Sequence, residues 1–206
     1  MKKKWRALFL LTAILFLLLS VTSCAKAPAE SVDEPHVYGE ELSEYLVPLS
    51  FRGRTVSLAE GEQKDLAILR LLVAEAVVTE YPKDALSYYE GQIRAHDRYL
   101  AELTGVGYEE YLAANGRDEE TVAKEAREMV RTDLVLAYVT AEAGLALSDG
   151  EKAEHYDRYA DRYVSEYGYG REYVDEHMRD EVFESMQYDK TMEYLILVNT
   201  FEVEAS

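Results

Sequence analysis

From about residue 57 onward, the hydrophobic positions of the chain recur at the three- and four-residue steps of an α-helix. Ser57 to Glu60 forms a capping-box sequence, which predicts a helix start, and the run 66–78 that follows is apolar on nearly all sides. We therefore expect this helix to lie centrally in the fold. Pro82 suits the first turn of the next helix, which should end at Gly105 and Gly107. The apolar positions of that helix fall on one stripe together with His96, which we expect to be a packing residue. The stripe comprises Leu86, Tyr89, Ile93, His96, Leu100 and Leu103.

The same periodicity predicts a short helix over about 108–114 and a long one over about 118–143, whose first turn is acidic. Ser148 to Glu151 is a second capping box, and it starts a helix that carries four tyrosines on one face. A short helix over about 171–177 and a final helix over about 180–198 complete the pattern. These positions predict an all-α fold in which long helices are joined by short loops. The four tyrosines of one face are Tyr156, Tyr159, Tyr163 and Tyr167.

One stretch of the chain, residues 46–58, departs from the helical pattern. Apolar and polar residues alternate around Phe51, Gly53 and Val56, as they do in a half-buried strand. The Arg52-Gly53 pair is typical of a turn. We expect a short strand or hairpin here, inside an otherwise helical protein.

The N-terminus has the three regions of a bacterial lipoprotein signal. Four basic residues precede an apolar run over 7–19, and Val21-Thr22-Ser23 leads to Cys24, the single cysteine of the 206 residues. The run is shorter than the roughly 20 residues of a membrane span. We expect residues 1–23 to be a signal peptide and Cys24 to be acylated at the extracytoplasmic face of the cell membrane. The alternative is an N-terminal anchor helix with an incidental cysteine.

Residues 24–35 contain prolines and small residues without periodic apolar positions, so we expect a flexible tether that leads to a helical domain over 36–206. All 40 acidic residues follow Cys24, whereas four of the 22 basic residues precede it, so a chain starting there has a net charge of −22. Such a charge argues against binding to nucleic acid or lying on an anionic membrane. The lipid should be the sole membrane contact.

The residues show no pattern that requires catalytic chemistry. Both G-x-G sequences lie between predicted helices rather than after a strand, and no zinc-type HExxH or G-x-S-x-G sequence occurs. With so many carboxylates, an acidic residue near each histidine is expected by chance. We expect no enzyme activity, no metal, no cofactor and no small-molecule substrate.

Several short sequences, in order, resemble the motifs of one known family. They are Glu80-Tyr81-Pro82, the YEEYL of 108–112, Asp118-Glu119-Glu120, the LVL of 134–136 leading to Gly144 and Asp149, Glu166-Tyr167-Gly168, and the final helix from Tyr188 to Leu195. Together, from about Leu69 to Val203, they resemble the C-terminal peptide-binding domain of trigger factor, which is related in fold to the helical core of SurA-type chaperones. The resemblance implies an arm-and-cradle arrangement of helices that binds unfolded chains.

The departures from that family limit what the resemblance implies. We expect neither the sheet-based prolyl isomerase domain of the family, for which there is no room between the short extended segment and the helix that follows it, nor its ribosome-binding domain. The implied function is that of a lipid-anchored holdase, which binds unfolded or newly exported polypeptides without isomerase activity. The alternatives are a structural or adaptor lipoprotein that grips one folded partner, and the helical half of a foldase that has lost its isomerase.

The tyrosine face allows two interpretations. The rings either form a half-buried packing face with hydroxyls reaching solvent, or they line a groove in which amphipathic rings contact varied apolar segments. The surrounding negative charge would favour clients with basic residues. The candidate peptide-binding residues are Tyr156, Tyr159, Tyr163, Tyr167, Leu86, Tyr89, Ile93, Phe183, Met186 and Tyr194.

Overall fold

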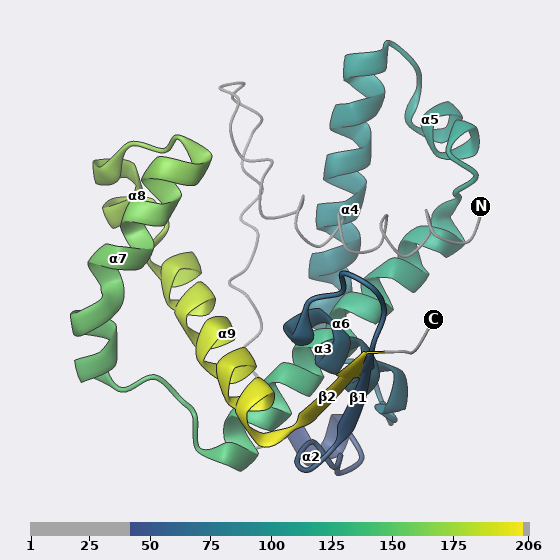
Figure 1. Ribbon diagram of the computed structural model, residues 1–206. Coiled ribbons are helices and arrows are strands. Elements are labelled where there is room, and N and C mark those ends of the chain that lie inside the picture. The colour runs from purple at the N-terminus through teal and green to yellow at the C-terminus, as the bar shows by residue number, and fades with distance from the viewer. Residues whose placement is uncertain (1–41, 204–206) are drawn as a thin grey trace. The chain divides into compact units, whose positions relative to one another are not determined.

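The computed structural model describes residues 42–203, which form eight helices and two short strands (Figure 1). The predicted mostly helical fold with a short strand is therefore confirmed. The predicted signal peptide 1–23, the lipidation site Cys24 and the tether 24–35 lie outside the described residues. Within 42–203, none of the helices has the length and hydrophobicity that crossing a membrane requires.

The described part of the predicted 36–206 domain divides into two compact units. Unit 1 comprises residues 81–130, and unit 2 comprises residues 42–80 together with 131–203. Helix α6, Glu119–Ala143, runs from unit 1 into unit 2. Each unit has hydrophobic clusters of its own.

Unit 1 contains α4 (Lys83–Thr104), α5 (Tyr108–Ala114) and the first half of α6. Gly105 ends α4 because it adopts a left-handed conformation, φ 73°, that a side chain would disfavour. Asp118 precedes α6 and accepts a hydrogen bond from the Thr121 amide at 2.8 Å, which caps the helix. The core of unit 1 comprises Ile93, Leu112, Val122 and Ala126.

The face that α4 buries differs from the predicted stripe. The buried positions are Ala85, Ile93, Asp97 and Ala101, at steps of eight, four and four, whereas Leu103 is 66% exposed. Small alanines allow helices to approach closely, and a ranking by hydrophobicity alone places them below leucine. The stripe prediction was therefore right at Ile93 and wrong at Leu103.

Unit 2 contains α2 (Leu42–Tyr45), β1 (Thr55–Leu58), α3 (Lys64–Glu75), the second half of α6, α7 (Asp149–Tyr167), α8 (Arg171–His177), α9 (Arg179–Val198) and β2 (Thr200–Val203). Its larger core forms where α3, α6, α9 and the strands meet, and it includes Ile68, Leu72, Val135, Val139 and Leu195, all fully buried. As predicted, α3 lies against this core. Helix α9 packs on both α3 and α7.

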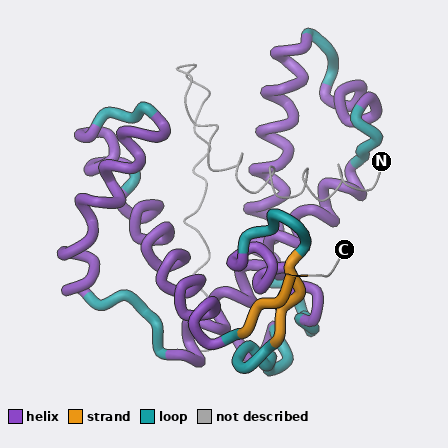
Figure 2. Tube along the Cα trace, viewed as in Figure 1, coloured by secondary structure: helices purple, strands orange, loops and turns teal. Residues whose placement is uncertain are grey.

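The two strands form a parallel pair, in the register Thr55↔Thr200 to Leu58↔Val203 (Figure 2). The predicted strand therefore exists, but the hairpin is wrong, since β1 pairs with a C-terminal segment for which no strand was predicted. The Asn199 side chain links the start of β2 to the segment before β1. It accepts a hydrogen bond from the Arg54 amide at 2.7 Å and donates one to the Phe51 carbonyl at 3.0 Å.

The capping box predicted at Ser57 is also wrong, because Ser57 and Leu58 belong to β1 and α3 begins seven residues later, at Lys64. Helix α3 ends at Glu75, earlier than the apolar run suggested, since Val78 instead pairs with Leu46 in an antiparallel bridge. The second capping box is confirmed. The Ser148 amide donates to the Glu151 carboxylate at 2.8 Å, and the Glu151 amide donates to the Ser148 hydroxyl at 3.3 Å.

Candidate functional site

The predicted site residues of α7 come together with Phe183 and Met186 of α9 in one hydrophobic cluster of unit 2, which we call the tyrosine core. Its buried members are Tyr156, Tyr159, Ala160, Tyr163, Val174, Val182 and Met186, with Tyr167 and Phe183 partly buried against them. The three buried tyrosines are 7–9% exposed. Their rings therefore pack between helices, and little ring surface is left for a ligand.

The buried tyrosine hydroxyls find protein partners rather than solvent. Tyr156 donates to the Asp175 carboxylate and Tyr159 to the Asp189 carboxylate, each at 2.9 Å. Tyr163 donates to the Glu181 carbonyl at 3.1 Å and lies 2.8 Å from the Ser185 hydroxyl. Burial raises the pKa of all three phenols, so each stays protonated and can donate.

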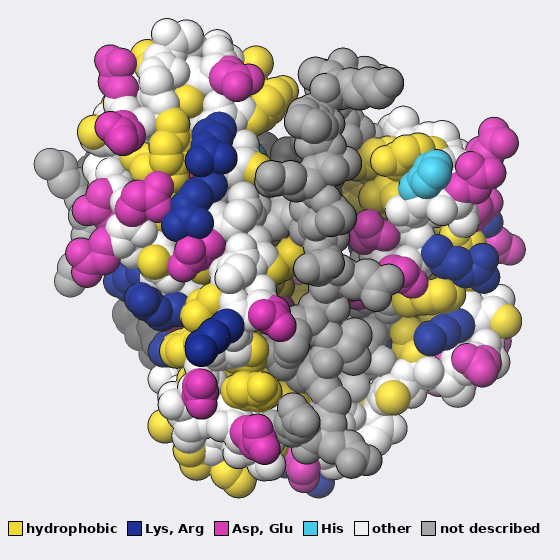
Figure 3. Space-filling model, turned by 180° about the vertical axis from the view of Figure 1, so that it is seen from behind, with side chains coloured by type: hydrophobic (Ala, Val, Ile, Leu, Met, Phe, Trp, Pro, Cys, Tyr) yellow, Lys and Arg dark blue, Asp and Glu magenta, His cyan; other side chains and the backbone are white. Residues whose placement is uncertain are grey.

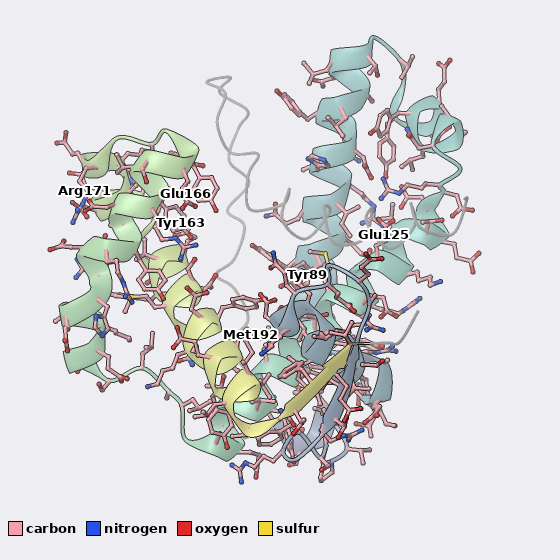
Figure 4. The ribbon with its side chains drawn as sticks, in the orientation of Figure 1. Tyr89, Glu125, Tyr163, Glu166, Arg171 and Met192 are labelled. Atoms are coloured by element: carbon pink, nitrogen blue, oxygen red, sulfur yellow. The ribbon has the colours of Figure 1, made fainter. Side chains whose placement is uncertain are left out.

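An arginine joins α7 to α8 at the edge of the tyrosine core (Figure 4). The Arg171 guanidinium contacts Asp157 at 2.5 Å, Asp161 at 2.8 Å and Asp175 at 2.9 Å. Hydrogen bonds to these carboxylates, first of all to Asp157 and Asp175, raise the pKa of Arg171. The three carboxylates are thus partly neutralised. Within residues 42–203 no group of three or more His, Cys, Asp or Glu side chains has an arrangement that could hold a metal ion.

The other candidate residues lie in separate places. Tyr89 and Ile93 belong to the core of unit 1, and Leu86 is half-buried on the same helix. Tyr194 packs at the edge of the larger core of unit 2, where its hydroxyl accepts from the Arg52 guanidinium at 2.7 Å. Nine of the ten candidates therefore lie in three separate clusters. Their assignment to a peptide-binding surface stays a prediction.

Unit 1 contains an ion pair that the sequence analysis missed. Asp97 is 2% exposed and accepts from Arg117 at 2.7 Å, and Arg117 also contacts Glu125. Burial alone would lower the pKa of Arg117, but the hydrogen bond to Asp97 and the charge of Glu125 raise it. Asp97 lies on the buried face of α4, four residues after Ile93, and that spacing was the available signal.

Large apolar side chains remain exposed in both units, and two sets of them are neighbours. On α4, Tyr99 and Leu103 are four residues apart, so they share a face, and they are 43% and 66% exposed. In unit 2, Val47 and Val77 lie opposite each other across a 3.0 Å backbone hydrogen bond and are 43% and 59% exposed.

Two apolar side chains near the C-terminal limit of the described residues are exposed as well. Leu197 on α9 is 82% exposed and Val203 on β2 is 70% exposed. The face drawn in Figure 3 shows hydrophobic side chains reaching the surface between acidic and basic ones. An open surface hollow of about 260 Å³ at the start of α6 is lined by polar and charged side chains, including Asp118, Lys124 and Arg127. Its composition does not suit an apolar ligand.

The exposed apolar positions were not distinguished in the sequence, because a helical stripe does not show which part of it a neighbouring helix covers. Tyr99 and Leu103 lie in the last two turns of α4, just before Gly105.

Searches of protein-family models, of curated proteins and of solved structures found no match to this chain.

Proposed function

We propose that the protein is a lipid-anchored holdase at the extracytoplasmic face of the membrane, which binds unfolded or newly exported polypeptides. It needs no ATP, cofactor or metal. It catalyses no reaction, and in particular it does not catalyse prolyl isomerisation. The arm-and-cradle arrangement implied by the resemblance to trigger factor is part of this proposal. The observation that carries it is the pairing of exposed apolar side chains on both units, Tyr99 with Leu103 and Val47 with Val77.

Separate pairs of exposed apolar side chains suit a protein that binds many different chains weakly. Burying apolar surface contributes about 25 cal/mol per Å², so a pair of side chains gives modest affinity and several contacts along one client add up. The chain as a whole has a net charge of −18. Such charge keeps the protein itself soluble while its apolar side chains remain exposed.

Aggregation assays with two unrelated denatured proteins, one basic and one acidic, test this function. At near-equimolar ratio the protein should slow the aggregation of both. The variants Tyr99→Ser/Leu103→Ser and Val47→Ser/Val77→Ser should each protect less. Their unfolding free energies should change little, since exposed substitutions usually stay within about 0.5 kcal/mol. A matched control, Ala95→Ser/Glu102→Ser, alters two exposed positions of α4 without removing a large apolar side chain.

The adaptor alternative makes the opposite prediction in the same assay. An adaptor protects neither denatured protein, and it retains a single folded partner during purification from its host. If the wild-type protein fails to slow aggregation of either client at a twofold molar excess, the holdase function is wrong. If both serine variants protect as well as the wild type, these apolar pairs are not the binding surface.

A further inference from the structure

The two-stranded sheet of unit 2 has one protected edge and one open edge. The Thr200 amide donates to the Arg54 carbonyl at 2.8 Å, and the parallel register pairs Thr55 with Thr200. Backbone N–H and C=O groups point to alternate sides along a strand. Those of Thr200 and Glu202 therefore form hydrogen bonds with β1, whereas those of Phe201 and Val203 point away from β1. Within residues 42–203, β2 has β1 as its sole strand neighbour.

The outer edge of β1 is covered by a side chain. The Arg70 guanidinium donates to the Ser57 carbonyl at 3.4 Å, and a charged side chain of this kind hinders the addition of another strand. The outward backbone groups of Phe201 and Val203 form no hydrogen bond within the described part of the chain. Across the register, Leu58 is 8% exposed but Val203 is 70% exposed. The apolar face of the sheet is therefore covered at Leu58 of β1 and exposed at Val203 of β2.

We propose that β2 accepts an extended segment of an unfolded client as a third strand. This inference rests on the proposed holdase function and names the mode of binding. Backbone hydrogen bonds at Phe201 and Val203 would hold any extended chain without regard to its sequence, as in strand addition to an open sheet edge. Selectivity comes from alternation, because every second client side chain continues the apolar face of Val56, Leu58, Phe201 and Val203.

The charges near β2 favour a client over the other occupants. Glu202 points to the polar face of the sheet, is exposed and forms no ion pair in the described residues, so it suits a client with basic residues at alternate positions. A second copy would bring its own Glu202 close to this one, on a chain whose net charge is already −18. The sequence 25–41 of the chain itself contains two prolines and five acidic residues, a poor composition for a strand.

The test uses the full chain and an octapeptide of alternating valine and lysine. Adding the peptide should slow hydrogen exchange at the Phe201 and Val203 amides about tenfold or more. The variant Val203→Pro removes an outward amide without touching a bond to β1, so it should weaken peptide binding about tenfold, the effect of roughly one hydrogen bond plus the obstructing ring. The matched control Val203→Thr keeps the amide and should bind within about threefold of the wild type.

The backbone of the peptide provides a second control. The same octapeptide with alternate amide nitrogens methylated cannot complete the ladder, and it should not slow exchange at Val203. Equal binding of the methylated peptide would show that side chains alone hold the ligand and would overturn strand addition. A Val203 amide that is already protected without peptide, or a dimer that Val203→Pro dissociates, would show that the chain itself or a second copy fills the edge.

The aggregation assay separates this inference from the function on which it rests. If the wild-type protein protects denatured clients and Val203→Pro protects equally well, the edge is not used although the holdase function stands. If the wild-type protein protects no client, the proposed function itself fails, whatever the peptide does.

Discussion

Asp97 shows how one charged residue inside a core depends on its partner. Its carboxylate is almost fully buried on α4, and Arg117 lies 2.7 Å away with a side chain 21% exposed. A buried carboxylate without a partner would be strongly destabilising, because the interior solvates charge poorly. The ion pair therefore holds the short segment that contains α5 against α4, since Arg117 is the third residue after the end of α5.

Replacing Asp97 should accordingly destabilise unit 1. In Asp97→Ala the Arg117 guanidinium loses its closest buried partner, and we expect the free energy of unfolding to fall by about 3 kcal/mol, the lower end of the range for breaking a buried pair. Chemical denaturation measures this change. The matched control Arg94→Ala removes a half-buried surface arginine that pairs with Glu90 and Glu119, and it should cost about 1 kcal/mol or less. Equal losses in the two variants would contradict the structural role assigned to Asp97.

Glu151 is a residue whose charge state ties helix capping to pH. A hydrogen bond from Lys190, followed by bonds from Ser148, lowers the pKa of Glu151 to about 2. In the unfolded chain the ordinary value is about 4.3. Since the folded pKa is the lower one, the stabilisation is fully present above about pH 5 and is lost as the pH falls toward 2.

The variant Glu151→Gln should therefore lose stability at neutral pH and show a smaller further loss on acidification than the wild type. Unfolding free energies measured between pH 7 and pH 2 test this. Glu154→Gln is the control, because Glu154 is exposed on the same helix and forms no ion pair within the described residues. Its acid profile should follow that of the wild type. A Glu151→Gln profile parallel to the wild type would refute the pH link.

At the scale of elements, the parts of the fold that are held by nearby residues were predictable from sequence. Helix α5 and helix α8 have the predicted bounds, and Ser148 with Glu151 caps α7 as expected, because these signals act over a few residues. The partner of β1 was not predictable, since Arg54 and Asn199 are 145 residues apart and no local pattern records their contact. The same holds for Arg117, whose charge gave no sign of a buried partner on another helix.

The tyrosine core shows the same difference within one candidate site. The spacing of Tyr156, Tyr159 and Tyr163 correctly placed them on one face, because helical geometry alone decides that. What covers the face depends on α8 and α9, which bring Asp175, Asp189 and Ser185 to the three hydroxyls. That coverage decides between packing and ligand binding, and the sequence of α7 does not contain it.

The triple variant Tyr156→Ser/Tyr159→Ser/Tyr163→Ser tests the role of this core. Each ring is 7–9% exposed, and the loss of one large buried aromatic typically costs about 3–5 kcal/mol. We expect the variant to lose helix content and to melt early or not to fold, as circular dichroism would show. Tyr173→Ser is the control, since Tyr173 is 44% exposed and its ring contacts those of Tyr169 and His177, and it should cost about 1 kcal/mol. A triple variant that keeps its melting temperature and loses client protection would instead support a groove.

At the scale of the whole molecule, the proposed function combines exposed apolar side chains with strong negative charge and an N-terminal lipid. The acidic residues oppose binding to anionic membrane lipids, so the body of the protein should not attach by itself. A holdase at the membrane surface therefore depends on its tether for position. The sequence Val21-Thr22-Ser23-Cys24 is the feature from which we expect that attachment.

The lipid anchor can be tested on the intact protein by mass spectrometry. When produced in a bacterium with the lipoprotein-processing enzymes, the wild-type chain should begin at Cys24 and carry acyl chains there, which add about 0.8 kcal/mol of membrane affinity per buried CH₂ group. The variant Cys24→Ala should lack the acyl mass and retain residues 1–23, because lipoprotein signal peptidase requires the modified cysteine. The control Ser23→Ala keeps a small residue before the cysteine and should be processed as the wild type is. An unmodified thiol at Cys24 in the native protein would rule out lipid attachment there, while leaving the aggregation assay, which needs no membrane, to decide the holdase function independently.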